Sequence, residues 1–474
     1  MANDTQLPET WVESDRVIPT RFARPLRRFT QLEAASGGVL LVAAFAAVLW
    51  ANLPVFGDSY TEFWETEFDL SFGSFLHLQE DLKHLVNDGL MTIFFFVVGL
   101  EIKREIRIGD LRDPRAAALP AIAALGGMIV PALIYFSFNA GTDAARGWGI
   151  PMATDIAFAV GLVALLGSRV PSTAKLFLLA LAIADDIGAI AVIAIFYTDE
   201  LSLPWLATGI FLLVVIYGAK RNNVRNVGFY WVVGIVVWFA ILESGVHATL
   251  AGVALGFLTP ANPYYAGREY DRRARETLDL YGADDSTTPA REHVEHEALQ
   301  LATVARESVS PLTRLEEALH PWSSFLVIPI FALANAGVVF SDISVGDAIT
   351  SSVALGVSFG LVVGKIFGIT LFTWFAIRLG LGVFPRGTGW ADIVGLSALA
   401  GVGFTVSLFI TELAFENPLF TDQAKIGIFI GSGLAGIVGN SLLRTSKTPE
   451  EEIAAGRERL GLDDPSATQA APAT

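Results

Sequence analysis

Twelve apolar runs recur along the 474-residue chain, and they constrain its fold more than any other feature. A helix that crosses a bilayer needs about 20 predominantly apolar residues. The mean hydropathy of +0.53 and the 53% share of hydrophobic residues are too high for a soluble domain of this length. We therefore predict an all-α polytopic membrane protein. The runs lie at about 38–54, 84–102, 117–138, 149–168, 174–197, 203–219, 226–242, 246–259, 323–340, 350–378, 391–414 and 425–443.

The segments that join the runs alternate in charge. Arginine and lysine gather in the N-terminal arm and in every second connection after it, whereas the connections between those are acidic. Because basic loops stay in the cytoplasm, the alternation predicts an even number of spans with both termini in the cytoplasm. Basic examples are Lys103, Arg104, Lys220, Arg221 and Arg444, and acidic ones are Asp58, Glu62, Asp342 and Glu416.

The charge pattern also divides the chain into three parts. We expect a cytoplasmic arm at 1–37, a transmembrane domain at 38–443 and a disordered cytoplasmic tail at 444–474. A long charged loop at 262–319 interrupts the transmembrane domain on its cytoplasmic side. Residues 71–83 (SFGSFLHLQEDLK) partly alternate in polarity after a glycine, which predicts a short hairpin on the outer side.

Net charge and cysteine content exclude several classes of function. The formal net charge is −16, and an acidic exterior argues against nucleic-acid binding. The chain has no cysteine, which excludes disulfides, thiol chemistry and thiolate metal sites.

Four ionisable residues stand well inside apolar runs, away from their ends: Asp155, Asp185, Asp186 and Lys365. Each such residue costs about 2.5–3.5 kcal/mol at the centre of a spanning helix, so together they burden the fold by on the order of 10–14 kcal/mol. That burden rivals the net stability of a whole domain, about 5–15 kcal/mol. Intramembrane charges of this kind usually have a function; the alternative is a structural ion pair that holds helices together.

Helical geometry separates the two neighbouring aspartates. Adjacent residues on a helix point about 100° apart, so Asp185 and Asp186 cannot share one partner symmetrically. One carboxylate can face a counter-charge while the other faces a cavity. Lys365 is the natural counter-charge, since it is the one lysine or arginine well inside an apolar run.

The fourth and eleventh runs are both interrupted near their middle. Thr154 and Asp155 follow Pro151 in the fourth run, and GLSALAGVGFTVS in the eleventh carries Gly401, Gly403 and hydroxyl residues. Both resemble helices that unwind and restart. If runs 3–5 and 10–12 form related triplets, the interruptions correspond, and such pairs indicate the substrate site of a transporter. Close helix packing is the alternative explanation of the glycines.

A second group of charges lies at the inner end of the second run. Glu101, Arg104 and Glu105 in GLEIKRE are expected to form an ion-pair cluster, which either responds to pH or anchors the span at the interface. His247 lies at the outer end of another span, where packing and titration are both open.

Seven separated motifs resemble the NhaA family of sodium/proton antiporters, over about residues 27–444. They are VGLEIKRE (98–105), ATDIAFAVGLVALLGSRVP (153–171), ALAIADDIGAIAVIAIFYT (180–198), SGVHATLAGV (244–253), LHPW (319–322), PIFALANAGV (329–338) and GVGFTVSLFI (401–410).

The resemblance implies twelve transmembrane helices with inverted-topology repeats and two interrupted helices that cross at mid-membrane. It implies electrogenic, pH-regulated exchange of H⁺ for Na⁺ or Li⁺ across a prokaryotic inner membrane, for sodium export and pH homeostasis. It implies a transporter rather than an enzyme, with no cofactor. It also implies a homodimer formed in part by the hairpin at 71–83.

Residue by residue, the resemblance assigns the sodium ion to Asp186, with Asp185 and Thr154 beside it. Asp185 would pair with Lys365 in one protonation state. Asp155 and Lys365 would compensate the partial charges at the ends of the half-helices. The residues implied in the pH response are Glu101, Arg104, Glu105, His247, Glu316 and His320, together with Glu317, which stands where the family often has histidine.

Three other classes of protein can place acids inside membrane helices. An intramembrane aspartyl protease needs aspartates on different helices and typically a Gly-x-Gly-Asp stretch, which this chain lacks. A sodium-coupled solute symporter also uses broken helices, and solute-independent exchange would argue against it. A passive channel fits least, because Lys365 beside the acids indicates a switching pair rather than an open ring.

Overall fold

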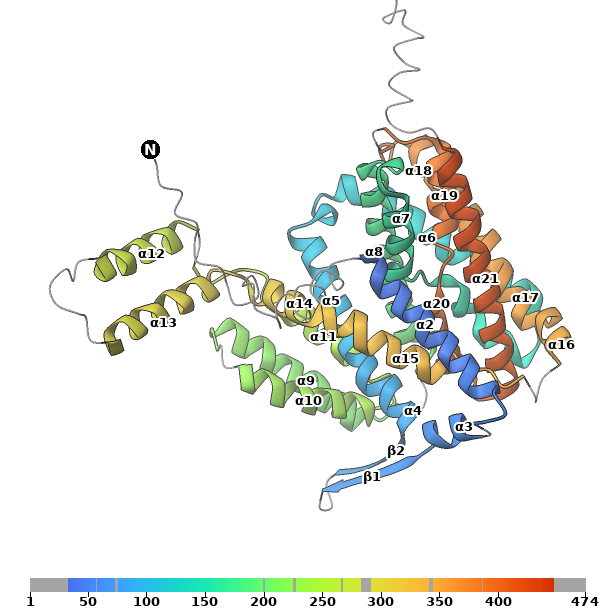
Figure 1. The fold of residues 1–474 in the computed structure, drawn as a ribbon, viewed down its shortest axis with the longest axis horizontal. Helices are drawn as coiled ribbons and strands as arrows, with labels where there is room; N and C mark the ends of the chain where they lie inside the picture. Colours follow the sequence, from blue (N-terminus) through green and yellow to red (C-terminus); the bar gives the residue numbers. More distant parts are fainter. Residues whose placement is uncertain are drawn as a thin grey trace, which may run out of the picture. The chain divides into compact units, whose positions relative to one another are not determined.

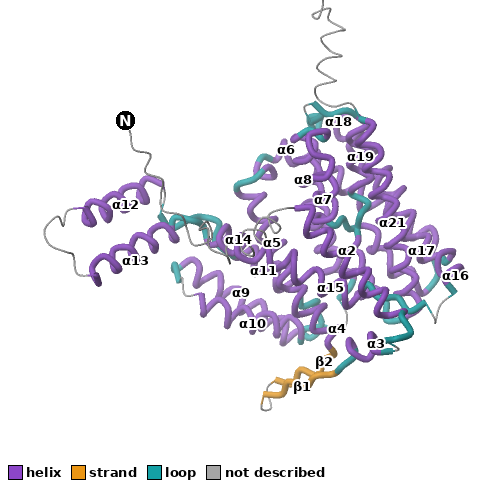
Figure 2. Tube along the Cα trace, in the orientation of Figure 1, coloured by secondary structure: helices purple, strands orange, loops and turns teal. Residues whose placement is uncertain are grey.

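The computed structural model describes residues 33–56, 58–72, 76–198, 201–224, 227–265, 267–282, 291–340, 344–385 and 387–446. Most of the predicted arm at 1–37 and of the predicted tail at 444–474 therefore lies outside the described residues. The rest of the chain is overwhelmingly helical (Figures 1 and 2).

Many helices of the described chain have the length and composition needed to cross a membrane. Nine of its helices are long and apolar enough to cross a bilayer. A bent pair, Trp390–Leu399 with Phe404–Ala414, makes a tenth span if it is counted as one. Two shorter apolar helices, Gly228–Leu242 and Thr249–Leu258, coincide with the seventh and eighth predicted runs. The prediction of a helical polytopic membrane protein is confirmed.

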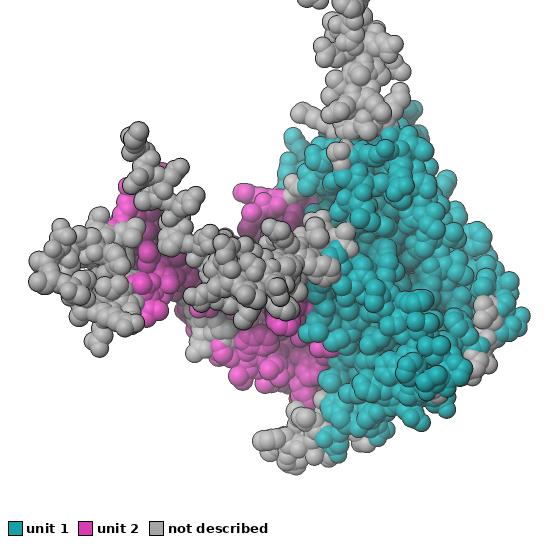
Figure 3. Space-filling model, in the orientation of Figure 1, with its two compact units in different colours: residues 1–86, 113–197, 324–474 teal, residues 87–112, 198–323 magenta. Residues whose placement is uncertain are grey.

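The described helices divide into two compact units, which Figure 3 shows in different colours. Unit 1 comprises the described parts of 1–86, 113–197 and 324–474. Its helices are α2 (Glu33–Asn52), α3 (Ser59–Trp64), α4 (Leu82–His84), α6 (Pro114–Asn139), α7 (Ile156–Leu166), α8 (Ser172–Phe196), α15 (Ile328–Asn335), α16 (Val345–Thr350), α17 (Ser352–Phe359), α18 (Lys365–Arg378), α19 (Trp390–Leu399), α20 (Phe404–Ala414) and α21 (Pro418–Thr445). It also contains strands β1 (Glu67–Phe72) and β2 (Leu76–Asp81), 3₁₀ helices Asp143–Met152 and Gly167–Arg169, and a π-helical turn Gly360–Gly364.

Unit 2 comprises the described parts of 87–112 and 198–323. Its helices are α5 (Met91–Arg107), α9 (Leu203–Arg221), α10 (Val227–Leu242), α11 (Thr249–Leu258), α12 (Gly267–Gly282), α13 (Arg291–Glu307) and α14 (Pro311–Trp322), with a 3₁₀ turn Asp110–Arg112. Two π-helical turns, Leu85–Leu90 and Ser323–Val327, lie where the chain passes from one unit to the other.

The core of unit 1 lies between α6, α8, α18 and α19. Glycines let α6 and α18 approach at backbone distance, because a Cβ at Gly126 would collide with the carbonyl of Gly368 and the reverse also holds. Small residues at such contacts are the usual device for packing helices inside a membrane. This close approach fixes α18, whose first residue is Lys365.

The predicted hairpin exists, but its bounds differ from the prediction. Strands β1 and β2 pair antiparallel from Glu67 opposite Asp81 to Phe72 opposite Leu76. The first strand therefore starts four residues before the predicted segment 71–83, and Lys83 at its end belongs to α4. The sequence pattern did not predict the start of β1, because the alternation of polar and apolar residues over Glu67–Leu70 is too short to indicate a strand.

The segment 262–319, predicted as one long charged loop, contains helices instead of continuous loop. Helices α12 and α13 pack against each other. Pro311 begins α14, with Ser310 as N-cap accepting from the Thr313 N–H at 3.1 Å. Residues Pro311–Asn335 are together long and apolar enough to cross a membrane, so this helical segment begins before the predicted run at 323–340. The charged residues of α14 hid this start, since the continuous apolar run begins only after it.

Candidate functional site

The first interruption of unit 1 lies between the 3₁₀ helix Asp143–Met152 and α7. Pro151 ends the 3₁₀ segment with a residue that lacks an N–H donor. Ala153 is extended, and Asp155 restarts the helix as N-cap of α7 by accepting from the Phe158 N–H at 3.1 Å. Aspartate is among the preferred residues at this position because its carboxylate satisfies an orphan donor and the positive helix end.

The second interruption separates α19 from α20, which are bent by 47°. A Cβ at Gly403 would lie 2.7 Å from the Ala153 carbonyl oxygen, so glycine is required where the two interruptions meet. The Asp155 N–H donates to the Val402 carbonyl at 2.7 Å, which joins the two unwound segments directly. The Thr154 hydroxyl adds a second link by donating to the Ala400 carbonyl at 2.8 Å.

Asp155 accepts hydrogen bonds from both helices that begin after the interruptions, α7 and α20. One oxygen, Oδ1, caps α7, while Oδ2 accepts from the Thr405 N–H at 3.1 Å and from the Thr405 hydroxyl at 2.5 Å in the first turn of α20. Asp155 is almost wholly buried. A single carboxylate therefore accepts hydrogen bonds from the first turns of two helices.

Lys365 reaches the same place from α18. Its Nζ donates to Asp185 Oδ2 at 2.7 Å and to Thr154 Oγ1 at 3.0 Å. The lysine and aspartate side chains are both 0% exposed. The predicted pairing of Lys365 with Asp185 is thus present in the geometry.

The remaining oxygens of the aspartate pair lie beside this contact. Asp185 Oδ1 is buried and accepts no hydrogen bond from the described residues. Asp186 is buried on the next position of α8 and, by helix geometry, points about 100° away. Asp185 thus faces the lysine, as the sequence predicted, and Asp186 lies on the next position of the same helix.

This site contains carboxylate and hydroxyl oxygens and one positively charged side chain, Lys365, but its described residues do not form a complete set of metal ligands. Among the described residues, no three His, Cys, Asp or Glu side chains are placed to hold one ion. A hard cation prefers several oxygen ligands, so one bound near Asp185 and Asp186 would need hydroxyl or carbonyl oxygens as well. The Thr154 hydroxyl and the carbonyls of the unwound segment are the nearest candidates.

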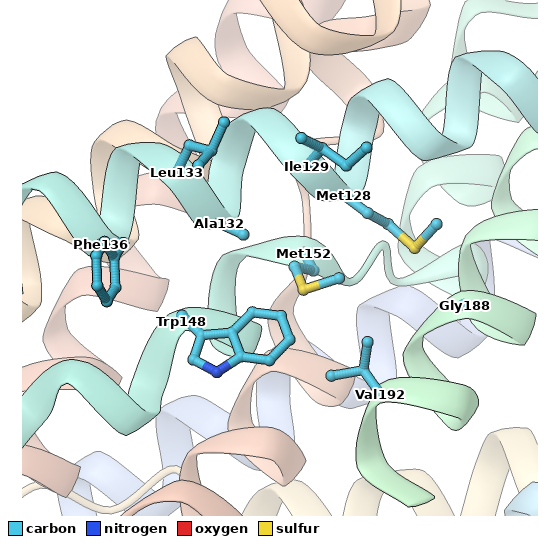
Figure 4. A pocket seen from close by; sticks show the side chains of 9 residues that line it. All are labelled: Met128, Ile129, Ala132, Leu133, Phe136, Trp148, Met152, Gly188 and Val192. Atoms are coloured by element: carbon cyan, nitrogen blue, oxygen red, sulfur yellow. The ribbon is translucent and has the colours of Figure 1, made fainter. Parts of the chain in front are cut away.

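A cavity of about 580 Å³ lies in unit 1 between α6, the 3₁₀ helix and α8 (Figure 4). Its lining is apolar, and it lacks the oxygens that a small cation needs. The cavity is therefore a different feature from the charged site. Its lining residues are Met128, Ile129, Ala132, Leu133, Phe136, Trp148, Met152, Gly188 and Val192.

The second group of predicted residues meets within unit 2. Arg104 on α5 forms ion pairs with Glu105, at 3.1 Å, and with Glu316 on α14. His320 Nε2 lies 3.9 Å from Glu101 Oε1. The structure therefore brings together Glu101, Arg104, Glu105, Glu316 and His320, and we call these five residues the Arg104 cluster.

Two other residues implied in the pH response take no part in these ion pairs. Glu317 is exposed on α14, and none of the Arg104 cluster's ion pairs includes it. His247 precedes α11, whereas Lys103 of α5 donates to the Phe257 and Thr259 carbonyls at the other end of that helix. The length of α11 thus separates His247 from this end of α5.

Sequence reasoning missed several participants. Thr405 was within the interrupted stretch, but nothing in the sequence paired it with Asp155, 250 positions earlier. Lys365 is also not the sole buried lysine, since Lys103 and Lys425 are buried as well. Glu412 pairs with Lys425 and with Lys83. The sequence did carry a signal for the pair with Lys425: Glu412 lies near the end of the eleventh apolar run and Lys425 at the start of the twelfth.

Comparison with known proteins gives concordant matches. The profile of the family described as Na⁺/H⁺ antiporter 1 matches residues 27–443. The Na⁺/H⁺ antiporter NhaA 2 of Sorangium cellulosum is 43% identical over 448 residues, covering 94% of this chain and 94% of that protein. The Na⁺/H⁺ antiporter NhaA of Oleidesulfovibrio alaskensis is 46% identical over 423 residues, or 89% and 93% of the two chains. That of Rhodopirellula baltica is 46% identical over 424 residues, or 89% and 94%.

Proposed function

The chain belongs to the Na⁺/H⁺ antiporter 1 family, and from this premise we propose that it exchanges Na⁺ or Li⁺ for H⁺ electrogenically, under pH control. Its place is a prokaryotic inner membrane, where exchange of this kind exports sodium and stabilises internal pH. Protons and alkali cations are its partners, and the proposal needs neither a cofactor nor an enzymatic activity.

The observation that carries the proposal is the buried ion pair of Lys365 with Asp185, beside Asp186. We assign the transported cation to Asp186, with Asp185 and Thr154 completing its oxygen ligands. In this structure Lys365 holds Asp185 Oδ2 and the Thr154 hydroxyl, both of which a cation would need. Binding of the cation therefore competes with the lysine as well as with protons.

Exchange follows from that competition. The two carboxyls titrate as a coupled pair, and Na⁺ binds the form from which protons have left. A site that opens to one side at a time then carries either protons or Na⁺ on each passage. Two protons per Na⁺, the stoichiometry implied by the resemblance, moves one net charge and lets the membrane potential drive sodium out. In acid the site fills with protons and transport stops.

We further propose the complete architecture of twelve spans with inverted-topology repeats and two interrupted helices crossing at mid-membrane. Among the described residues, support comes from the nine apolar helices of spanning length, the bent pair that could make a tenth, the two shorter apolar helices and the hydrogen bond between Asp155 and Val402. Asp155 and Lys365 would compensate opposite ends of the half-helices. The cytoplasmic arm (1–37), cytoplasmic tail (444–474), cytoplasmic segment 262–319 and hairpin-mediated homodimer are parts of the same proposal.

The Arg104 cluster is our candidate for pH control. Glu105 and Glu316 pair with one guanidinium, and His320 lies beside Glu101. Glu316 Oε2 is buried and accepts no hydrogen bond from the described residues. A change of one proton would therefore alter how α5 and α14 are held together. His247 and Glu317 remain candidates that would act outside this cluster.

The deciding experiment is sodium-induced proton release in everted membrane vesicles. Asp186→Asn removes the carboxylate charge while keeping the size of the side chain, and it should abolish the response. Asp347→Asn, the same change at an exposed position of α16, is the matched control and should exchange normally. Normal exchange by Asp186→Asn would remove Asp186 from the mechanism.

A further inference from the structure

Three charged side chains meet at the end of α20 remote from the interruptions. Glu412 Oε2 lies 2.6 Å from Lys83 Nζ of α4, and Glu412 Oε1 lies 3.0 Å from Lys425 Nζ of α21. The side chains of Glu412, Lys83 and Lys425 are 13%, 28% and 5% exposed. We call this group the Glu412 cluster. Three segments far apart in the chain converge in it, so it ties α20 to both α4 and α21.

The Glu412 cluster shares a helix face with the contact to Asp155. Thr405 and Glu412 are seven residues apart on α20, which is two helical turns, and residues at that spacing lie on one face about 10 Å apart. Thr405 holds Asp155 in the first turn of α20, and Glu412 holds two lysines in its last turn. Helix α20 is therefore fixed by charged contacts at each end.

The dipole of α20 favours the charges that lie at its two ends. A helix carries partial positive charge at its N-terminus and partial negative charge at its C-terminus. Asp155 lies at the first end and the two lysines lie at the second. Glu412 alone would be unfavourable near the C-terminus, so its presence makes sense only together with Lys83 and Lys425.

A short helix after an interruption needs such an anchor. The unwound residues 400–403 include Gly401 and Gly403, and a glycine-rich break transmits little positional restraint from α19. The 11 residues of α20 therefore take their position from their own buried face and from contacts at their two ends. At the first end these are the hydrogen bonds of Asp155 with Val402 and Thr405 and of Ser407 with the Ile150 carbonyl. In the last turn the charged contacts are those of Glu412, which complete the restraint on the helix that carries Thr405.

We propose that Glu412 is a positioning residue for the exchange reaction: with Lys83 and Lys425 it holds α20 so that Thr405 stays aligned on Asp155 beside the cation site. This proposal rests on the proposed function, since it assumes that the site beside Asp155 binds the transported cation. Glu412 touches neither the cation site nor Asp155, and it acts through the position of the helix.

The test measures exchange by Glu412→Gln in everted vesicles as a function of sodium concentration. The change keeps the shape of the side chain and removes the charge that both lysines share. The apparent KM for sodium should rise about tenfold, the scale on which residues remote from a ligand change its binding, while exchange at saturating sodium persists. Glu416→Gln, the same change at an exposed position just beyond α20, should leave the KM unchanged.

A double-mutant cycle separates positioning from general destabilisation. Thr405→Val removes the hydroxyl that contacts Asp155 and should raise the KM by itself. If Glu412 acts through Thr405, adding Glu412→Gln to Thr405→Val raises the KM little further. A merely structural role predicts two independent increases that multiply. Should Glu412→Gln fail to fold, Lys83→Gln leaves the Lys425 pair in place and should give a smaller increase in the same cycle.

The outcomes distinguish this inference from the function on which it rests. A wild-type protein that releases no protons in response to sodium would overturn the proposed function. Wild-type exchange with an unchanged KM in both Glu412→Gln and Lys83→Gln, or with multiplicative effects in the cycle, would overturn the positioning role alone.

Discussion

The charged site of unit 1 and the Arg104 cluster of unit 2 each pair carboxylates with one basic side chain. They differ in how deeply the pair is buried and in whether the basic residue is lysine or arginine. In unit 1, Lys365 and Asp185 are both 0% exposed. In unit 2, Arg104 is 38% exposed and Glu316 is 10% exposed. Lysine can give up its proton when buried, whereas arginine stays protonated in proteins. The first pair can therefore switch its charge, while the second can titrate only through its acids and His320.

The difference in burial also separates the energetics of the two regions. Removing one member of a fully buried ion pair leaves an uncompensated charge in a medium of low polarity. Removing Arg104, which is 38% exposed, leaves the carboxyls of Glu105 and Glu316, which are 12% and 10% exposed and can take up a proton in place of the lost cation. Mutations should therefore have large effects on stability and transport in unit 1, and smaller effects concentrated on pH response in unit 2.

The largest effect is expected at the fully buried pair. Lys365→Met leaves the Asp185 carboxylate without its counter-charge, and the free energy of unfolding should fall by about 3–5 kcal/mol. Thermal unfolding of the purified protein measures this. The double variant Lys365→Met with Asp185→Asn should recover most of the loss while exchange remains absent. Additive losses from the two changes would mean that the pair is not coupled.

A smaller effect is expected at the Arg104 cluster. Arg104→Gln removes the partner of Glu105 and Glu316, and because these buried carboxyls can take up a proton instead, the loss of stability should be about 1–3 kcal/mol. The pH dependence of exchange should shift, because the acids that surrounded the guanidinium lose their fixed cation. An activity–pH profile identical to that of the wild type would remove the Arg104 cluster from pH control.

A Glu317 variant tests whether the pH response of unit 2 depends on the Arg104 cluster or on the exposed face of α14. It is exposed and takes no part in the ion pairs of the Arg104 cluster. Glu317→His should therefore shift the activity–pH profile less than Arg104→Gln does, with no change in thermal stability. A larger shift from Glu317→His would place the sensor on the exposed face of α14 rather than around Arg104.

The smallest effect is expected on the exposed helix α12. Hydrogen bonds from Arg272 and Arg273 hold the pKa of the Glu269 carboxyl below its ordinary value of 4.5. A depressed folded-state pKa stabilises the helix fully above the ordinary value and loses that contribution as the pH falls through the folded-state value. Hydrogen exchange at 267–282 should speed up in acid relative to a Glu269→Gln variant, with sodium transport unaffected. Equal acid sensitivity in both proteins would contradict this.

Sequence patterns predicted the parts of the fold that local chemistry determines. Apolar runs located the spans, and Pro151 with the glycines of GLSALAGVGFTVS located both interruptions, because backbone and burial preferences act over a few residues. The buried lysine and the adjacent acids were conspicuous for the same reason, since each is costly in an apolar run.

The rest depended on contacts between distant segments. The pairing of Thr405 with Asp155 and of Glu412 with Lys83 brings together residues hundreds of positions apart. A single sequence carries no signal for such pairs beyond the presence of the residue types. The beginnings of β1 and α14 were missed for a local reason: the alternation at the start of β1 covers only a few residues, and charged residues in α14 interrupt the apolar run.

The central claim is that protons and Na⁺ compete for the oxygens of Asp185 and Asp186. Sodium titration by calorimetry, at several pH values and in buffers of different ionisation enthalpy, measures both affinity and proton release directly. The account predicts that proton release accompanies binding, that affinity weakens steadily toward acid pH, and that Asp186→Asn loses both. Sodium binding with equal affinity in acid and alkali and without proton release would contradict it.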